Sequence, residues 1–222
     1  MAACKVRRLS RGDVVYAIGD QPGGVYGLVE GGLSVSYPAP GRGTFFAQFA
    51  VSGWWFGVGS ILTGEPRRVT IEATRPTVLA YLPIREIDVI LEQQPELWRW
   101  FGVLAMMNLD LALGAAEDLA IRNPRQRCAA VLLRLATGHA DTPAEVGAVE
   151  VDVTQGEFAT MTNLSRNAAG GVLREWTNAG LVAMRYGRVR VLDFAGLQRI
   201  RRGKRVTAKP LDHEMERAVA AY

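Results

Sequence analysis

The sequence that decides the fold runs from Thr154 to Leu192 and reads TQGEFATMTNLSRNAAGGVLREWTNAGLVAMRYGRVRVL. Thr154 and Glu157 have the spacing of a capping box, which begins an amphipathic helix because each side chain satisfies a free backbone N–H. Asn163 tolerates the left-handed conformation that a tight turn needs. Ser165 can then cap a second helix. This order predicts two short helices joined by a tight turn.

The second helix is expected to end at Gly180, and a basic hairpin follows it. Apolar and basic residues alternate about a Tyr-Gly turn: Val182, Met184, Tyr186, Gly187, Arg188, Val189, Arg190 and Val191. Such alternation is typical of a hairpin with one buried face. The layout is that of a winged helix-turn-helix, whose second helix enters the major groove of DNA. The alternative is a small α/β unit that packs against another part of the protein and has solvated arginines.

The charge of this region favours the nucleic-acid interpretation. Residues 150–206 contain ten basic and five acidic residues, whereas the whole chain has a formal net charge of +4. The basic excess therefore lies in the predicted helix-turn-helix, where neutralisation of phosphates requires it.

The chain of 222 residues is long enough for two domains, each with its own core. A hydrophobic share of 49% and a charged share of 22% are typical of a folded soluble protein. We expect a cytoplasmic protein without a membrane partner, because no apolar run has the length of a membrane span or signal peptide. Cys4 and Cys128 lie far apart, which favours reduced thiols and cannot supply the ligands of an iron–sulfur cluster.

Residues 6–83 contain short β-type runs separated by glycines. The runs include Val14–Tyr16, Leu28–Val29, Leu33–Tyr37, Thr44–Phe46 and Val69–Ile71. Regular turns between alternating strands predict an all-β sandwich or barrel, with most of the glycines in turns.

A long apolar helix is predicted over residues 97–121, with Pro95 in its first turn. It carries so few charged residues that nearly every side requires burial. A β-roll covers only one side. The same helix of a second subunit is the simplest cover for the other side, which predicts a two-fold dimer. The alternative is the core helix of a large monomeric domain.

Asn123 and Pro124 interrupt this pattern and mark a domain boundary. A further helix is predicted over residues 125–137, followed by a polar loop over residues 138–149. The expected organisation is a β-roll sensor domain at 1–94, a dimerisation helix at 95–122, a winged-helix DNA-binding domain at 123–206 and a C-terminal tail at 207–222.

This organisation resembles the cyclic-AMP receptor protein and fumarate–nitrate-reduction regulator (CRP/FNR) family of bacterial transcription factors, over roughly residues 8–200. The segments that carry the resemblance are Gly19–Val35, Gly53–Gly57, Arg127–Ala136 and Thr154–Asp193. The implied fold is α+β, with a cyclic-nucleotide-binding-like β-roll of the jelly-roll type, a long dimerisation helix and a C-terminal winged helix-turn-helix. The family implies a homodimer that binds a palindromic promoter site on double-stranded DNA and contacts RNA polymerase to change transcription.

The effector site departs from the pattern of the nucleotide-binding members. Its candidate lining residues are Phe56, Gly57, Val58, Arg67, Arg68, Val69, Ala112 and Leu113. Val58 replaces a glutamate that binds the ribose, and Ala112 and Leu113 replace a hydroxyl pair that holds the adenine. The phosphate-binding arginine corresponds to Arg67, or to Arg68 in a shifted alignment.

A buried nucleotide without these partners would leave polar groups unpaired, at about 1–3 kcal/mol each. We therefore expect no tight response to cyclic AMP. The pocket is expected to be more apolar than a nucleotide site. It either binds a different, unidentified small-molecule effector or is filled by its own side chains.

The candidate DNA contacts are Thr154, Thr162, Ser165, Arg166, Asn167, Gly171 and Arg188. Ser165 and Arg166 match the family pattern, and Arg166 can bind guanine O6 and N7 together. Asn167 replaces a glutamate and is suited to adenine N6 and N7. Gly171 stands where the family has a second base-reading arginine. The two-fold symmetry of the implied dimer predicts half-sites in an inverted repeat, about one DNA turn apart.

Thr154, Thr162 and Arg188 are expected to contact phosphates and so set the register on the duplex. Gly170 and Gly171 inside a helix cost about 1 kcal/mol each relative to alanine. Two explanations remain open for this pair. It permits close approach of the backbone to DNA, or it reflects weak selection.

An enzyme is not expected. A metal catalyst of the cupin type needs clustered histidines, and the only histidines, His139 and His213, lie outside the roll. No GxSxG, CxxC or P-loop motif occurs, and we expect no catalytic residue, metal or cofactor. The alternatives to a regulator that does not respond to cyclic AMP are a regulator gated by a cyclic nucleotide or another small molecule, and a protein-interaction module with a degenerate DNA-binding domain.

Overall fold

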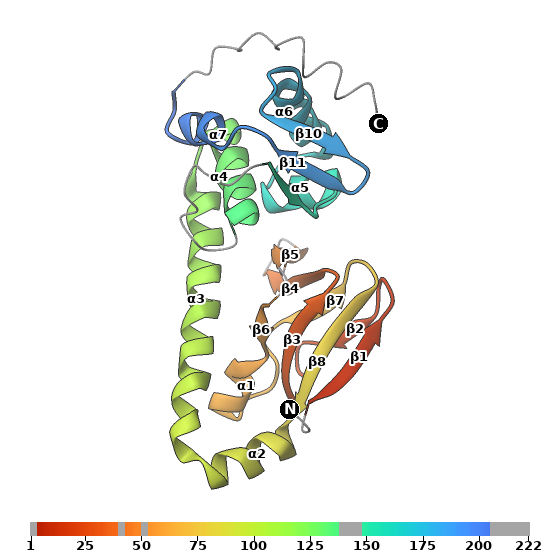
Figure 1. Ribbon diagram of the computed structural model, residues 1–222, viewed down its shortest axis with the longest axis vertical. Helices are drawn as coiled ribbons and strands as arrows, with labels where there is room; N and C mark the ends of the chain where they lie inside the picture. The colour runs from red at the N-terminus through yellow and green to blue at the C-terminus, as the bar shows by residue number, and fades with distance from the viewer. Residues whose placement is uncertain (1–3, 40–42, 50–52, 138–147, 205–222) are drawn as a thin grey trace. The chain divides into compact units, whose positions relative to one another are not determined.

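The structure, a computed structural model, describes residues 4–39, 43–49, 53–137 and 148–204. The chain divides into two compact units, Met1–Ala115 and Ala116–Tyr222 (Figure 1). Most of the predicted loop at 138–149 and all of the predicted tail at 207–222 lie outside the described residues.

The first unit is built on two antiparallel sheets. One sheet has the order β1-β8-β3-β6 and the other the order β2-β7-β4-β5. The strands are β1 (Lys5–Leu9), β2 (Val14–Tyr16), β3 (Gly24–Glu30), β4 (Leu33–Ala39), β5 (Gly43–Phe49), β6 (Trp55–Phe56), β7 (Thr70–Ala73) and β8 (Thr77–Pro83). The predicted β-roll is therefore confirmed, and the predicted strands correspond to β2, β3, β4, β5 and β7, with Val69 just before β7.

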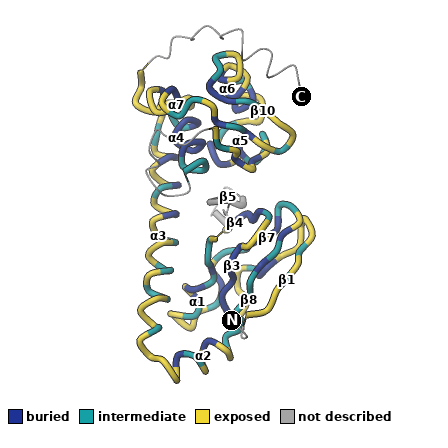
Figure 2. The backbone as a smooth tube through the Cα atoms, viewed as in Figure 1, coloured by how far each residue is buried: buried dark blue, intermediate teal, exposed yellow. Residues whose placement is uncertain are grey.

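The core of the roll lies between these sheets. Alternate residues of β3 point to opposite sides, so Tyr26 and Leu28 join Leu33 of β4 and Ile71 of β7 in one buried cluster. Val25 of β3 belongs to a second cluster. Figure 2 shows the buried stretches on the strands of both sheets.

The second cluster joins helices to the other face of β3. They are α1 (Val58–Thr63), α2 (Ile84–Gln93) and α3 (Trp98–Ala120), with a 3-10 turn at Pro95–Leu97 before α3. Val58, Ile87 and Leu91 pack with Val25, and Phe101 of α3 covers them. The predicted long helix is thus present, and Pro95 lies in the 3-10 turn that leads into it.

One side of α3 remains exposed in the single chain. Trp100, Met106, Met107, Leu109 and Leu113 keep 61%, 56%, 57%, 47% and 52% of their surface accessible. Figure 2 shows these exposed stretches along the helix. Burial of large apolar side chains contributes about 1.5–3 kcal/mol each, so this surface gains stability from any protein partner that covers it.

The second unit contains the predicted helices and hairpin. Its elements are α4 (Pro124–Thr137), β9 (Val149–Val151), α5 (Gln155–Met161), α6 (Arg166–Asn178), β10 (Val182–Arg185), β11 (Arg188–Val191) and α7 (Phe194–Arg201). The antiparallel sheet has the order β10-β11-β9. Helix α4 is buried continuously from Cys128 to Leu133. Residues 121–123 separate α3 from α4, which begins at Pro124, and the two compact units divide within α3.

Among the described residues, no helix is both long and apolar enough to cross a membrane.

Candidate nucleic-acid interface

The first helix of the pair, α5, begins at the predicted capping box. The Glu157 backbone N–H donates to Thr154 Oγ1 at 3.2 Å, and the Thr154 N–H donates to the Glu157 carboxylate at 2.7 Å. Two free backbone donors at the helix start are satisfied in this way. Phe158 and Met161 are buried on the inner side of the helix. Thr154 itself is exposed, so its predicted phosphate contact stays a prediction.

The turn between the helices is fixed by Thr162 and Asn163. Asn163 has a φ of 50°, the left-handed conformation predicted for this position. Thr162 is fully buried, and its hydroxyl donates to the Phe158 carbonyl at 2.8 Å and to the Ala159 carbonyl at 3.2 Å. A buried hydroxyl that bonds its own helix cannot reach a phosphate. The predicted phosphate contact of the Thr162 side chain is therefore wrong.

The Arg127 guanidinium group stabilises this turn through hydrogen bonds to backbone carbonyls. Arg127 of α4 donates from Nε to the Thr162 carbonyl at 2.6 Å and from Nη1 to the Ile121 carbonyl at 2.7 Å. It thereby satisfies carbonyls at the end of α5 and just past the end of α3. This role was not predicted from the sequence, where Arg127 is one of two arginines ahead of an apolar run.

The second helix, α6, presents the predicted reading residues in its first turn. Ser165 Oγ caps the helix by accepting from the Ala168 N–H at 3.2 Å. Arg166 and Asn167 are exposed, whereas Leu173 and Trp176 are buried. Because buried residues anchor the middle and end of α6, its first turn is presented to solvent on a rigid support. This geometry is compatible with insertion of the helix start into a DNA groove.

The two glycines of α6 have different surroundings. Gly170 is buried, and a Cβ at this position would collide with the side-chain amide of Gln155. That amide donates to the Arg166 carbonyl at 3.2 Å, which links α5 to α6. Gly171 has open space where a side chain would stand. Gly170 thus packs against the flexible end of Gln155, which a side chain at this position would displace, whereas a side chain at Gly171 would meet open space.

The hairpin forms as predicted, with Val189 and Val191 buried in β11. Met184 was predicted on the apolar face, but 38% of its surface is exposed, and it lies near the turn of the hairpin. Arg188 makes ion pairs with Glu150 at 3.1 Å and with Asp152 at 2.6 Å. A phosphate contact by Arg188, which stays a prediction, would compete with these two carboxylates.

Another ion pair connects α4 to the end of α3. Arg134 Nε donates to the Asp118 carboxylate at 2.7 Å, and both side chains are largely buried. Burial raises the pKa of Asp118 above its usual value, and the Arg134 guanidinium opposes this shift. Because desolvation is the larger effect, the pair fixes geometry more than it adds stability.

In the roll, the predicted phosphate arginine points inward. Arg67 is 3% exposed and donates to the carbonyls of Gly57 and Gly24, each at 2.7 Å. Its guanidinium carbon lies 4.4 Å from the centre of the Tyr16 ring, and burial raises the pKa of the Tyr16 hydroxyl while Arg67 opposes this effect. A Cβ on Gly57, which has a φ of 86°, would approach Arg67 Nη1 to 2.9 Å. Arg67 and Gly57, both predicted to line the effector site, therefore lie together. They are joined by a hydrogen bond to each other.

Aromatic rings occupy the interior next to this arginine. The centre of the Tyr26 ring lies 5.8 Å from that of Tyr16, 5.5 Å from that of Phe56 and 4.8 Å from that of Tyr81. Trp54 stacks on Phe56 at 4.5 Å. Phe56, a predicted lining residue, is thus part of the core.

The other predicted effector residues are dispersed. Val58 is buried in the cluster that contains Ile87 and Leu91 of α2, and Val69 packs against the core between the two sheets. Arg68 is exposed, and so are Ala112 and Leu113 on α3.

Asn108 of α3 makes hydrogen bonds to the β6 region, a contact that was not predicted from the sequence. It accepts from the Trp54 indole at 2.5 Å and donates to the Trp55 carbonyl at 3.1 Å. A single amide within an apolar helix was the available signal.

Comparison with known proteins agrees with this geometry. The model of the Crp-like helix-turn-helix domain matches residues 126–200, and that of the cyclic nucleotide-binding domain matches residues 6–94. The chain belongs to the CRP/FNR family. As a CRP/FNR member, it is a transcriptional regulator with a helix-turn-helix DNA-binding domain.

Similar proteins cover nearly the whole chain. The transcriptional regulator LdrP of Thermus thermophilus is 29% identical over 197 residues, 87% of this chain and 95% of LdrP. The solved structure of TTHB099, a CRP-family transcriptional regulator of the same species, has 28% identity and a TM-score of 0.67, covering 91% of this chain and 100% of that one. FixK2 of Bradyrhizobium japonicum, at 16% identity and a TM-score of 0.75, shares the fold over 92% of this chain and 99% of its own.

Alanine substitutions at the two glycines of α6 should differ in their effect on stability. Gly171→Ala is expected to raise the free energy of unfolding by about 0.5–1 kcal/mol, because alanine favours the helix and meets open space. Gly170→Ala should show no such gain, since the new methyl displaces Gln155. Urea denaturation of both variants measures the difference, and an equal gain in both would contradict the packing role of Gly170.

Proposed function

We propose that this regulator is a homodimer that reads a palindromic promoter site with α6 and acts on transcription together with RNA polymerase. The proposal depends above all on one observation, the capped first turn of α6 with exposed Arg166 and Asn167 on a buried support. A bacterial regulator must reach chromosomal DNA, which lies in the cytoplasm. We therefore also propose a cytoplasmic location.

The chemistry of base reading follows from the side chains at the start of α6. Arg166 can donate two hydrogen bonds to O6 and N7 of one guanine, and Asn167 can pair with N6 and N7 of an adenine. Gly171 offers no side chain one turn further on, so recognition is concentrated at the helix start. We propose that Thr154 and Ser165 lie near phosphates, where helix N-termini favour anions.

The exposed side of α3 is the proposed dimer surface. Met106, Leu109 and Leu113 follow one another at intervals of three and four residues and lie opposite Phe101 and Leu104, which pack on the roll. This spacing matches the seam of a coiled coil. A two-fold axis along the seam would present two copies of α6 to one face of a duplex.

We further propose that cyclic AMP is not a tight effector. The arginine that would meet a phosphate already binds two carbonyls, and Val58 offers no acceptor for a ribose hydroxyl. A ligand would have to replace the contacts of Arg67 before gaining its own. The cyclic nucleotide-binding domain model over residues 6–94 favours the second candidate, a regulator that responds to a cyclic nucleotide or another small molecule.

Arg166→Ala should abolish sequence selectivity. Loss of one bidentate contact costs about 1–3 kcal/mol, or roughly a tenfold to hundredfold loss of affinity for the preferred site, while weak salt-sensitive binding persists. Arg199→Ala, which removes one exposed charge from α7, serves as the control and should keep selectivity. Footprinting and competition with random DNA measure both variants. Unchanged selectivity in Arg166→Ala would show that the assigned reading contact is wrong.

Leu113→Asp should convert the dimer to a monomer, because a buried carboxylate on the seam is strongly unfavourable. Light scattering after size exclusion is expected to give twice the chain mass of 24.2 kDa for the unmodified protein and the chain mass for the variant. Leu62→Asp, at a leucine of α1 with 41% exposure, is the matched control and should stay dimeric. A monomeric unmodified protein would contradict the dimer.

Calorimetric titration of the full chain with cyclic AMP and cyclic GMP separates the two effector proposals. We expect the dissociation constant of either nucleotide to exceed about 100 μM. This limit corresponds to a binding free energy weaker than roughly 5.5 kcal/mol. Sub-micromolar binding would instead support the nucleotide-responsive regulator and would mean that Arg67 exchanges its carbonyl partners for a phosphate.

A further inference from the structure

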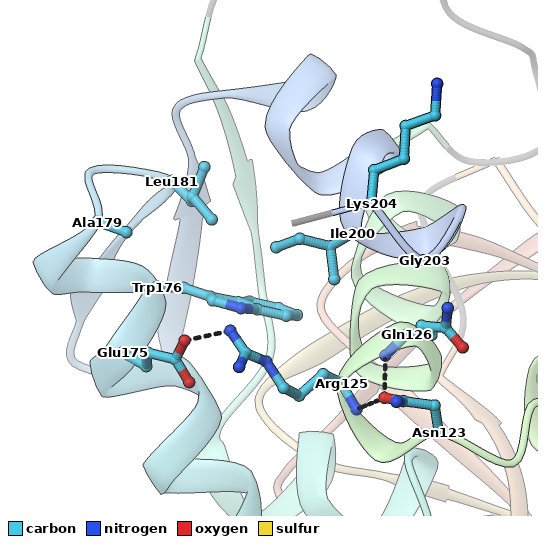
Figure 3. A pocket seen from close by; sticks show the side chains of 10 residues that line it. All are labelled: Asn123, Arg125, Gln126, Glu175, Trp176, Ala179, Leu181, Ile200, Gly203 and Lys204. Carbon is cyan, nitrogen blue, oxygen red and sulfur yellow. Dashed lines mark hydrogen bonds and ion pairs between the residues drawn. The ribbon is translucent and has the colours of Figure 1, made fainter. Parts of the chain in front are cut away.

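A cavity in the second unit lies away from the proposed reading residues. Its volume is about 380 Å³, and it is lined by the start of α4, the end of α6, Leu181 and the end of α7 (Figure 3). Trp176 on its wall is ten positions after Arg166, which corresponds to roughly 15 Å along a helix. Ligand pockets in proteins have volumes of about 300–1,000 Å³, so the cavity fits a small molecule.

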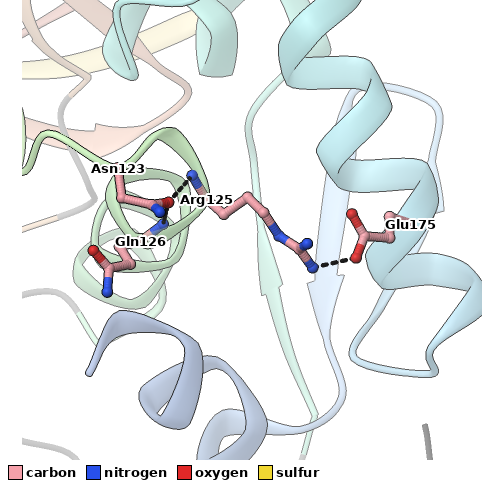
Figure 4. A network of polar contacts seen from close by, with 4 residues as sticks. All are labelled: Asn123, Arg125, Gln126 and Glu175. Carbon is pink, nitrogen blue, oxygen red and sulfur yellow. Dashed lines mark hydrogen bonds and ion pairs between the residues drawn. The ribbon is translucent and has the colours of Figure 1, made fainter. Parts of the chain in front are cut away.

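The polar groups of the cavity leave donors available. Asn123 Oδ1 already accepts from the backbone N–H groups of Arg125, at 2.9 Å, and Gln126, at 3.2 Å. The Glu175 carboxylate is bound by the Arg125 guanidinium (Figure 4). A guanidinium has five N–H donors and the Lys204 ammonium has three, so most of their capacity remains for a further acceptor. The two cations also exceed the one carboxylate, which makes the lining suited to an anion.

A buried donor on the same wall lacks a partner. The Trp176 side chain is 1% exposed, and its indole Nε1 has no hydrogen-bond partner among the described residues. Buried tryptophans usually place this N–H against an acceptor, because an unpaired buried donor destabilises the protein. In Figure 3 the indole borders the cavity together with Ile200 and Leu181, which supply apolar surface.

We propose that this cavity binds a small carboxylate with an apolar body. The carboxylate would lie near Arg125 and Lys204 and supply the acceptor that the Trp176 indole lacks. The apolar body would pack on the Trp176 ring, Leu181 and Ile200. Since the lining residues come from α4, α6 and α7, the ligand stabilises the second unit as a whole. The site is independent of DNA reading, and its test uses the free protein.

The test is a titration of the full-length, ¹⁵N-labelled protein with phenylacetate and with 3-methylbutanoate. The chain has five tryptophans, so the Trp176 indole signal is identified by its loss in Trp176→Phe. We expect this signal to shift, with a dissociation constant below about 1 mM for at least one of the two acids. Phenylacetamide keeps the ring without the charge, and inorganic phosphate keeps the charge without the apolar body. Each should bind at least tenfold more weakly.

Variants separate the site from nonspecific effects of charge. Lys204→Gln should weaken binding about tenfold. Arg174→Gln removes an exposed charge of α6 outside the cavity and should leave binding unchanged. The proposal is overturned if neither acid shifts the Trp176 signal at 10 mM. Equal binding of phenylacetamide, or unchanged affinity in Lys204→Gln, would overturn it as well.

Discussion

The geometry of the DNA-binding unit depends on the two hydrogen bonds of Arg127. Its guanidinium binds the Thr162 carbonyl at 2.6 Å and the Ile121 carbonyl at 2.7 Å. The last carbonyls of a helix have no partner within that helix, so one charged donor here satisfies the ends of two helices. The left-handed Asn163 follows Thr162 directly, and the direction of α6 is set at that residue. The position of Arg166 thus depends on a side chain that never needs to approach DNA.

Arg67 acts in the same way in the roll. Both arginines satisfy backbone carbonyls next to the beginning or end of a regular element, and each makes two such hydrogen bonds in the free protein. A positive charge in a sequence is thus an ambiguous sign of an anion site. In this chain the distinction matters most for the effector, because the family position of a phosphate ligand is occupied by a structural contact beside the Tyr16 ring.

Sequence alone predicted the features that depend on neighbouring residues. The Thr154 capping box, the turn at Asn163, the Ser165 cap and the strands of the roll follow from local hydrogen bonding and periodicity, and the structure contains them. The sequence alone could not predict contacts between segments that are distant along the chain. The burial of Thr162, the inward direction of Arg67 and the Asn108 link to Trp54 all depend on how helices and sheets pack, which local patterns do not encode.

The central claim is that paired α6 helices read an inverted repeat, and selection of bound sequences from random duplex DNA tests it most directly. The expected result is enrichment of two inverted half-sites whose centres lie about one helical turn apart, with a guanine at one fixed position of each. Enrichment of no sequence at modest salt, or of a single half-site without its inverted copy, would contradict it.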